Sequence, residues 1–156
     1  MTEQPTIPRY LGLDIGTKRI GVAVTDELGL TAQPVLTLNR RAQSREDLRS
    51  IARLCRRFHA AAIVVGDPLH LSGESSRQAQ RVQEFAKELG LLTDLPIHFV
   101  DERLTSHAAH EILYRAGHKR QEHVKVVDQI AAVLILETFL AGIRKSQAAE
   151  PPEMQN

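Results

Sequence analysis

The chain has 156 residues, of which 42% are hydrophobic, 25% charged and 4% aromatic. This length fits one domain, and these proportions exclude a disordered or collagen-like chain. A net charge of +1 provides no overall attraction to nucleic acid or membranes, and the scarcity of aromatic residues disfavours recognition by base stacking.

The first part of the chain predicts three strands in succession. Short apolar segments at 10–13 and 20–25 are separated by turn-forming residues, and a third segment follows at 33–38. Pro34 cannot donate a ladder hydrogen bond, so we expect the third strand at a sheet edge or Pro34 at the strand's start. Together the three segments predict an antiparallel meander.

From Ser44 onward, helical and strand patterns alternate. Ser44 and Asp47 have a spacing like that of a capping box, and the apolar positions after them predict a helix that buries Cys55. The later pattern predicts a strand at 61–65, a helix at 75–89 ended by Gly90, a strand at 96–100, a helix at 105–116 closed by Gly117, and a nearly all-apolar helix at 126–143. The order βββαβαβαα is typical of an α/β fold with helices on the faces of a mixed sheet.

The chain ends and the single cysteine indicate the domain limits and the compartment. Residues 1–8 and 146–156 are polar and contain prolines, so we expect disordered tails around one domain at 9–145. Cys55 cannot form an intrachain disulfide or a cysteine-based zinc cluster. The N-terminus has no signal-peptide pattern, and no apolar run approaches the ~20 residues of a membrane span. We therefore expect a cytoplasmic protein with no membrane partner.

Three carboxylates interrupt or adjoin apolar elements. Asp14 ends the first predicted strand, Glu102 follows the fifth, and Asp128 lies at the start of the last helix. A buried carboxylate is costly unless it is paired, hydrogen-bonded or bound to a metal. Mg²⁺ prefers oxygen ligands and is usually held by a few carboxylates and waters. Acids that converge from separate segments therefore predict a divalent-metal site, which could activate water for phosphodiester hydrolysis.

Each acid taken alone also has a purely structural explanation. Asp14 could shape a turn, and Asp128 could complement the positive end of its helix. Asp101 or Glu102 could form an exposed ion pair with Arg103. The metal hypothesis therefore depends on the three acids as a set.

The glycines near Asp14 do not have the spacing of a phosphate-binding P-loop. Gly12 and Gly16, followed by Thr17 and Lys18, are one residue too close together for that motif. Tight turns between strands are the simpler explanation for these glycines and for Gly21.

Four motifs, in this order, carry a resemblance to a known family. They are LGLDIGTKRIGVAV at 11–24, VVGDPL at 64–69, DERLTS at 101–106 and KVVDQIAA at 125–132. Over about 9–143 the chain closely resembles the YqgF family, whose members are described as pre-16S rRNA nucleases or Holliday-junction-resolvase-like proteins. The resemblance implies a ribonuclease H-like fold whose five-stranded mixed sheet is antiparallel in its first three strands and then parallel.

The resemblance also implies a site and a reaction. Asp14, Glu102 and Asp128 would be catalytic and would hold Mg²⁺ or Mn²⁺, with metal-bound water as the nucleophile. We expect a nuclease that processes the 5′ end of pre-16S rRNA in ribosome biogenesis. Two alternatives stay open: a resolvase of branched DNA, and a non-catalytic nucleic-acid-binding or ribosome-assembly module on the same fold. Structured precursor RNA, branched DNA or ribosomal particles would be the partners of a monomer or homodimer.

Asp67 and Asp101 are further candidate metal ligands. The family usually has Gly-Leu-Pro where this chain has Gly66-Asp67-Pro68, and ribonuclease H-like nucleases often have a carboxylate at the end of that strand. The alternative is an aspartate in a polar surface loop. Alternation along a strand allows only one of Asp101 and Glu102 to face inward, and we favour Glu102.

Basic residues near these acids predict contacts with substrate phosphates. The loop after Asp14 and the basic segment 118–125 both adjoin the predicted site, although each could be an ordinary solvated loop. The helix from Ser44 carries arginines along one side, which suits phosphate binding but also an ordinary exposed face. The candidates are Thr17, Lys18, Arg19, Arg103, Lys119, Arg120 and Lys125, with Arg45, Arg49, Arg53 and Arg56 on the helix.

Overall fold

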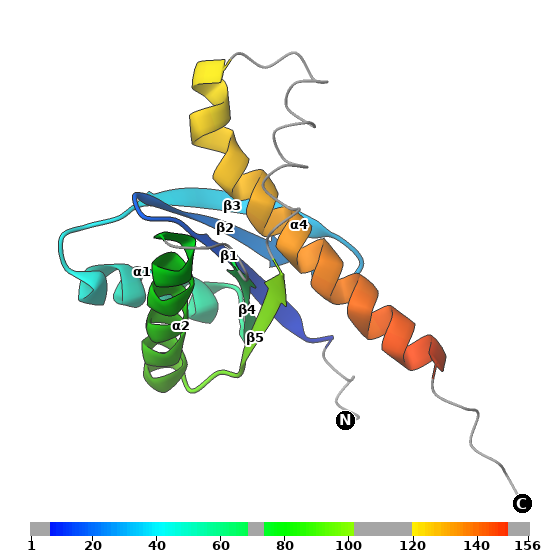
Figure 1. The fold of residues 1–156 in the computed structure, drawn as a ribbon. Helices are drawn as coiled ribbons and strands as arrows, with labels where there is room; N and C mark the ends of the chain where they lie inside the picture. The colour runs from blue at the N-terminus through cyan, green and yellow to red at the C-terminus, as the bar shows by residue number, and fades with distance from the viewer. Residues whose placement is uncertain (1–6, 69–73, 102–119, 150–156) are drawn as a thin grey trace, which may run out of the picture.

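The computed structural model describes residues 7–68, 74–101 and 120–149, in which five strands form one sheet in the order β3-β2-β1-β4-β5 (Figure 1). The strands are β1 (Arg9–Ile15), β2 (Arg19–Thr25), β3 (Ala32–Asn39), β4 (Ala60–Asp67) and β5 (Ile97–Asp101). The helices are α1 (Ser44–Arg57), α2 (Glu74–Thr93) and α4 (Arg120–Ala149). The predicted helix at 105–116 lies outside the described residues.

The sheet is mixed, as predicted. β1 pairs antiparallel with β2, and β2 pairs antiparallel with β3. β4 is parallel to both β1 and β5. β3 is an edge strand, and its Pro34 pairs with Ala23 where the β2–β3 register shifts. The proline therefore occupies a place where a missing ladder hydrogen bond is tolerated.

Side-chain alternation along β1 divides the core into two layers, one on each face of the sheet. Leu11, Leu13 and Ile15 belong to a cluster that includes residues of α1 and α2. The opposite face carries α4, which buries Ala132 and Leu136 in a second cluster (Figure 1). Because neighbouring residues of a strand point to opposite faces, Gly12 and Asp14 lie on the α4 face.

The start of α1 differs from the predicted capping box. Gln43 is the N-cap residue, and it makes no side-chain capping hydrogen bond. Asp47 is only 1% exposed, and its carboxylate accepts hydrogen bonds from Arg40 Nε and from the backbone N–H of Arg41. The capping-box prediction is wrong because Asp47 holds the β3–α1 connection in place instead of pairing with Ser44.

Gly90 does not end α2. The helix continues to Thr93, and a Cβ at Gly90 would lie 3.2 Å from Cγ1 of Ile97. Asp94, with a φ of 58°, follows the helix and donates its backbone N–H to the Gly90 carbonyl. The small residue at position 90 therefore serves the contact with β5, and the left-handed turn falls on Asp94.

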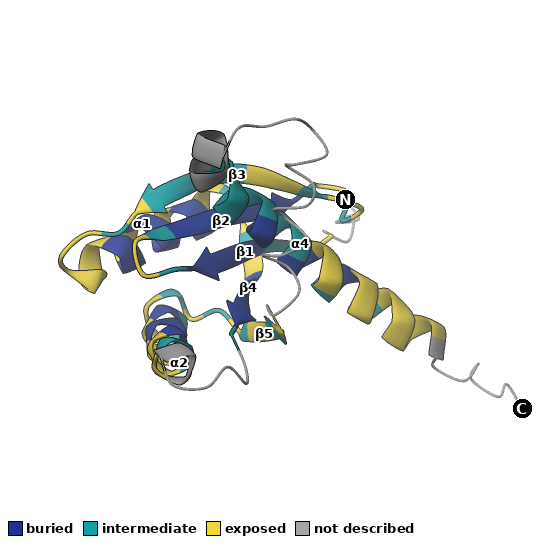
Figure 2. Ribbon diagram, turned by 45° about the horizontal axis from the view of Figure 1, so that its top comes forward, coloured by how far each residue is buried: buried dark blue, intermediate teal, exposed yellow. Residues whose placement is uncertain are grey.

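The last helix is longer than predicted at both ends. α4 includes residues 146–149, where the sequence suggested a disordered tail, and its C-terminal half extends exposed beyond the sheet (Figure 2). Val126–Ala148 is long and apolar enough by length and composition to cross a membrane. That property is weak evidence for a membrane span, because Ala131, Ala132 and Ile135 are buried against the sheet.

Candidate active site

Gly21 is the point where α4 lies directly on the sheet. A Cβ at Gly21 would overlap the backbone carbonyl of Asp128, so the helix backbone rests on β2 at this residue. In the antiparallel register, Gly21 is the partner of Asp14. Because Asp14 lies on the α4 face, Asp14 and Asp128 flank the same glycine. Two of the three predicted catalytic acids therefore come together from β1 and α4.

Gly12 provides a second close contact with α4. A Cβ at Gly12 would lie 2.5 Å from Cγ of Leu136 and 3.1 Å from the carbonyl oxygen of Ala132. The expectation that Gly12 and Gly21 serve tight turns is wrong, because both lie within strands and make room for the helix. Gly16 does lie in the β1–β2 turn, where its N–H donates to the Arg19 carbonyl.

Both acids are largely shielded from solvent. Asp14 is 7% exposed, and the side chain of Asp128 is 17% exposed. Asp128 comes eight residues after the first residue of α4, which places it in the third turn of the helix. The helix-dipole explanation for Asp128 is therefore wrong, because that effect is confined to the first turn. A carboxylate this far from solvent is costly unless it is paired, hydrogen-bonded or bound to a metal, so Asp128 needs a partner.

Arg19 is that partner in the structure. Its Nε lies 3.0 Å from Oδ2 of Asp128, in an ion pair that is partly shielded from solvent. Thr17 and Lys18, the other two predicted phosphate-binding residues of this segment, are exposed in the turn between β1 and β2. Arg19 thus contacts a predicted metal ligand, which the sequence analysis did not foresee.

Asp67 and Asp101 lie on the opposite face of the sheet. Asp67 alternates in phase with Val65, which packs in the α1/α2 cluster, and Gln83 of α2 donates to Oδ2 of Asp67 at 3.4 Å. Asp101 is the register partner of Asp67 in β5. By strand alternation Asp67 and Asp101 therefore lie on the α1/α2 face, opposite Asp14, so the structure does not bring them together with Asp14, and their role as metal ligands stays a prediction.

Of the remaining predicted residues near the acids, some lie outside the described residues and others belong to α4. Glu102, Arg103 and Lys119 lie outside the described residues, and Arg120 and Lys125 belong to α4, before Asp128. Within the described ranges, no group of three or more His, Cys, Asp or Glu side chains is placed to hold a metal ion. The structure therefore does not test Glu102, the third predicted metal ligand.

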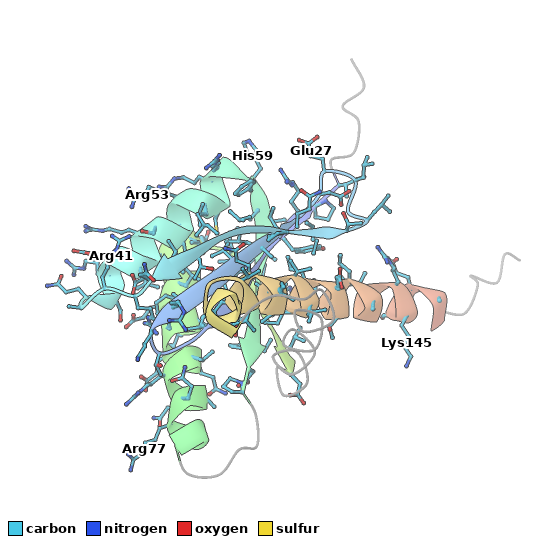
Figure 3. All side chains as sticks on the ribbon, turned by 90° about the horizontal axis from the view of Figure 1, so that it is seen from above. Glu27, Arg41, Arg53, His59, Arg77 and Lys145 are labelled. Carbon is cyan, nitrogen blue, oxygen red and sulfur yellow. The ribbon has the colours of Figure 1, made fainter. Side chains whose placement is uncertain are left out.

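The arginines of α1 form a separate basic groove. Arg45, Arg49, Arg53 and Arg56 are all exposed, as the one-sided pattern predicted. A hollow of about 390 Å³ is lined by Arg41, Glu46, Arg49, Ala52, Arg53, Arg56 and Leu92. Figure 3 shows Arg41, which precedes α1, and Arg53 of α1 on the side of the molecule away from α4, and both donate hydrogen bonds to Ser50 Oγ. Sequence analysis missed Arg41, because it precedes the helix.

The buried thiol of Cys55 is expected to be unreactive. Burial raises the pKa of Cys55 from 9.0 to about 11, and the side chain lies in the α1/α2 cluster. The thiolate is the reactive form of cysteine, so this residue is a core component and not a nucleophile.

Comparisons with known proteins show the family of this chain. The family model for RuvX, described as Holliday junction resolvase, matches residues 8–142. A relative from Moorella thermoacetica is 44% identical over 132 residues, covering 85% of this chain and 94% of the relative. One from Syntrophus aciditrophicus is 44% identical over 139 residues, covering 89% and 92%. Both carry the name "Putative pre-16S rRNA nuclease".

Solved structures support the fold. Thermus thermophilus RuvC in complex with a Holliday junction substrate matches with a TM-score of 0.56 at 15% identity, covering 88% of this chain and 96% of that one. The fowlpox virus resolvase in complex with Holliday junction DNA matches with a TM-score of 0.52 at 13% identity, covering 86% and 98%. These likenesses confirm the ribonuclease H-like fold, and the family match and the close relatives show that the chain belongs to the RuvX family of nucleases.

Proposed function

We propose that this chain is a divalent-metal-dependent nuclease that cleaves near the 5′ end of pre-16S rRNA. The observation that carries the proposal is the meeting of Asp14 and Asp128 at Gly21, on the face of the sheet covered by α4. The names of the relatives at 39–44% identity support the RNA substrate. The substrate also implies that the protein acts in the cytoplasm on precursor ribosomal particles.

The residues present fit a hard divalent cation. Asp14 and Asp128 supply carboxylate oxygens, which are the ligands that Mg²⁺ and Mn²⁺ prefer. Asp128 is already paired with one positive group, Arg19, so its surroundings accommodate positive charge. Glu102 is the proposed third ligand. Bound there, the ion would supply the activated water and would stabilise the leaving oxygen.

The exposed residues beside the acids would orient the substrate. Thr17 and Lys18 lie in the turn that follows β1, two and three residues beyond the buried Ile15. A hydroxyl and an ammonium group here can hold a phosphate next to Asp14 and offset its repulsion by the carboxylates. We assign the same role to Arg103, Lys119, Arg120 and Lys125.

The α1 groove would hold the RNA backbone away from the scissile bond. Arg45 and Arg56 are eleven residues apart, so the arginine row extends for about 16 Å along the helix. Guanidinium groups bind phosphates in a bidentate manner, and each such contact releases counterions. Binding through this groove would therefore weaken steeply as salt concentration rises.

Resolution of branched DNA is the second candidate function. The solved structures of RuvC and of the fowlpox virus resolvase contain Holliday junctions, and the matching family model has the same description. A junction has two-fold symmetry, so its symmetric cleavage favours a homodimer. Cleavage of RNA requires no two-fold symmetry, so a monomer suffices for it.

Cleavage assays on three substrates test the proposal. A 5′ pre-16S RNA fragment, a single-stranded RNA and a four-way DNA junction are incubated with Mn²⁺ and either wild type, Asp14→Asn or Asp94→Asn. Asp94 is exposed and follows α2, so its variant is the matched control. We expect cleavage of the precursor RNA, an activity loss of about 100-fold or more for Asp14→Asn, and no change for Asp94→Asn.

Two results would contradict the proposal. If wild type cleaves none of the substrates, or if Asp14→Asn cleaves as fast as wild type, the catalytic assignment fails. If only the junction is cleaved, the nuclease assignment stands and the RNA substrate is replaced by branched DNA.

A further inference from the structure

Arg19 has a contact that the proposed reaction does not use. Its guanidinium Nε lies 3.0 Å from Asp128 Oδ2, and the two side chains are 33% and 17% exposed. Asp128 is also a proposed metal ligand, so an arginine and a metal ion would compete for the same carboxylate. We propose that Arg19 is a resident counter-ion that a divalent metal ion displaces from Asp128, an inference that rests on the proposed function.

The backbone under Asp128 is held firmly. Its carbonyl rests on Gly21, and the neighbouring Gln129 donates from Nε2 to Thr37 Oγ1 at 3.1 Å. These contacts fasten α4 to β2 at Asp128 and to β3 at the next residue. Asp128 therefore has little freedom to move towards or away from a cation.

The side chain of Arg19 is the part that can move. Arg19 begins β2, and it alternates in phase with Gly21 and Ala23, which puts it on the α4 face. One third of the side chain is exposed, and its chain of methylenes gives it several rotamers that lead to solvent. Exchange of the guanidinium for a metal ion at Asp128 thus requires only a rotation of the Arg19 side chain and no rearrangement of the helix.

Electrostatics requires one cation to leave when the other arrives. Without a metal ion, the guanidinium balances part of the negative charge where Asp14 and Asp128 flank Gly21. A divalent ion bound at Oδ2 of Asp128 would lie within a few ångströms of that guanidinium, and the two would repel each other in a partly shielded site. Arg19 therefore opposes metal binding until its side chain has turned away.

The released guanidinium has a use at the same site. Arg19 closes the turn that exposes Thr17 and Lys18, so a guanidinium that leaves Asp128 stays next to these two residues. It can then bind a substrate phosphate with its forked donors. The exchange thus couples the metal to the substrate, because the ion that occupies Asp128 also frees a phosphate ligand.

Titration of Mn²⁺ into substrate-free protein by calorimetry tests this exchange. Arg19→Gln removes the competing charge, Arg19→Lys keeps a positive group, and Arg57→Gln, in the last turn of α1, is the matched control. We expect Arg19→Gln to bind Mn²⁺ about five- to tenfold more tightly than wild type, at the lower end of typical coupling between sites. Arg19→Lys and Arg57→Gln should remain within about twofold of wild type.

Thermal unfolding in EDTA and in Mn²⁺ gives a second readout that does not depend on activity. Arg19→Gln should have a lower Tm than wild type in EDTA and should gain more from Mn²⁺, because metal-free Asp128 has lost its partner. If Arg19→Gln binds Mn²⁺ as weakly as wild type or more weakly, Arg19 only orients Asp128 and the inference is wrong. If wild type binds no Mn²⁺, the proposed metal site is wrong as well. The two failures are therefore distinguishable, because only the second removes Mn²⁺ binding from wild type.

Discussion

The two faces of the sheet are packed by different means. On the α1/α2 face, large side chains fill the space between the layers, and Leu11, Ile51 and Leu89 have no exposed surface. On the α4 face, Gly12 and Gly21 let the helix backbone approach the strands directly. The first face resembles an ordinary hydrophobic core. The second face is thin, which means that the helix backbone contacts the strand backbone with no side-chain layer between them, beside Asp14 and Asp128.

This difference explains where the candidate site lies. A layer of large side chains would separate α4 from β1, and Asp128 could not then flank the same glycine as Asp14. On the other face, the buried Asp47 is held by Arg40. Asp67 accepts one hydrogen bond from Gln83 at Oδ2, while its buried Oδ1 has no hydrogen-bond partner among the described residues. Glycine on one face thus brings the two proposed catalytic acids together, while large aliphatic side chains on the other face supply stability.

The largest effect is expected from adding one methyl group at the thin face. Gly21→Ala places a Cβ on the backbone of Asp128, so α4 must move, and we expect a loss of about 3 kcal/mol in the free energy of unfolding, with loss of Mn²⁺ binding. Gly12→Ala meets mainly the flexible side chain of Leu136 and should cost less. Urea unfolding and calorimetry measure both effects.

Gly142→Ala is the matched control for these two substitutions. No described atom lies within 4 Å of a Cβ at position 142, which is exposed in α4. Alanine should therefore stabilise the helix by about 0.5–1 kcal/mol. If Gly21→Ala behaved like Gly142→Ala, the thin packing of the α4 face would be disproved.

An effect on stability alone is expected from the α1/α2 face. Ile51 is fully buried in the α1/α2 cluster, and Ile51→Ala should lower the free energy of unfolding by about 2–4 kcal/mol through the cavity that it leaves. Gly21→Ala has the larger consequence because it removes Mn²⁺ binding as well as stability. Mn²⁺ affinity of Ile51→Ala, measured on the folded protein, should equal that of wild type. A weaker affinity would show that the two faces are not independent.

The smallest effect concerns Cys55, the thiol of the α1/α2 face. With a pKa of about 11, roughly one thiol in a thousand is ionised at pH 8, compared with about one in ten at the ordinary value of 9.0. A disulfide reagent should therefore leave the native protein almost unmodified and should react rapidly in urea. Raising the pH towards 11 should speed the native reaction. Fast modification at pH 8 would show that this core is open to solvent.

Local patterns predicted the elements and one part of the site. Short apolar segments marked β1 to β5 correctly. The antiparallel meander, the edge reading of the strand with Pro34 and the packing of the last helix on the sheet were confirmed. Asp14 and Asp128 interrupted apolar elements, and the structure brings both to Gly21. Such signals are visible because each depends on a few consecutive residues.

Features that depend on a distant partner were not predictable in this way. Gly21 and Gly90 looked like turn or stop signals, yet they adjoin α4 and β5. Asp47 looked like a helix cap until its partner Arg40 was seen. The side of the sheet on which Asp67 lies was not predictable either. Val65 and Asp67 are two residues apart and share a face, but the sequence did not show that α4 covers the opposite face.

Anomalous diffraction from crystals soaked in Mn²⁺ tests the central claim most directly. The account predicts an anomalous peak about 2.0–2.3 Å from one carboxylate oxygen of Asp14 and one of Asp128, beside Gly21 and on the α4 face. It also predicts that the guanidinium of Arg19 has left Asp128 Oδ2. The account would be contradicted by a fully soaked crystal with no peak there, or by a peak on the opposite face at Asp67 or Asp101.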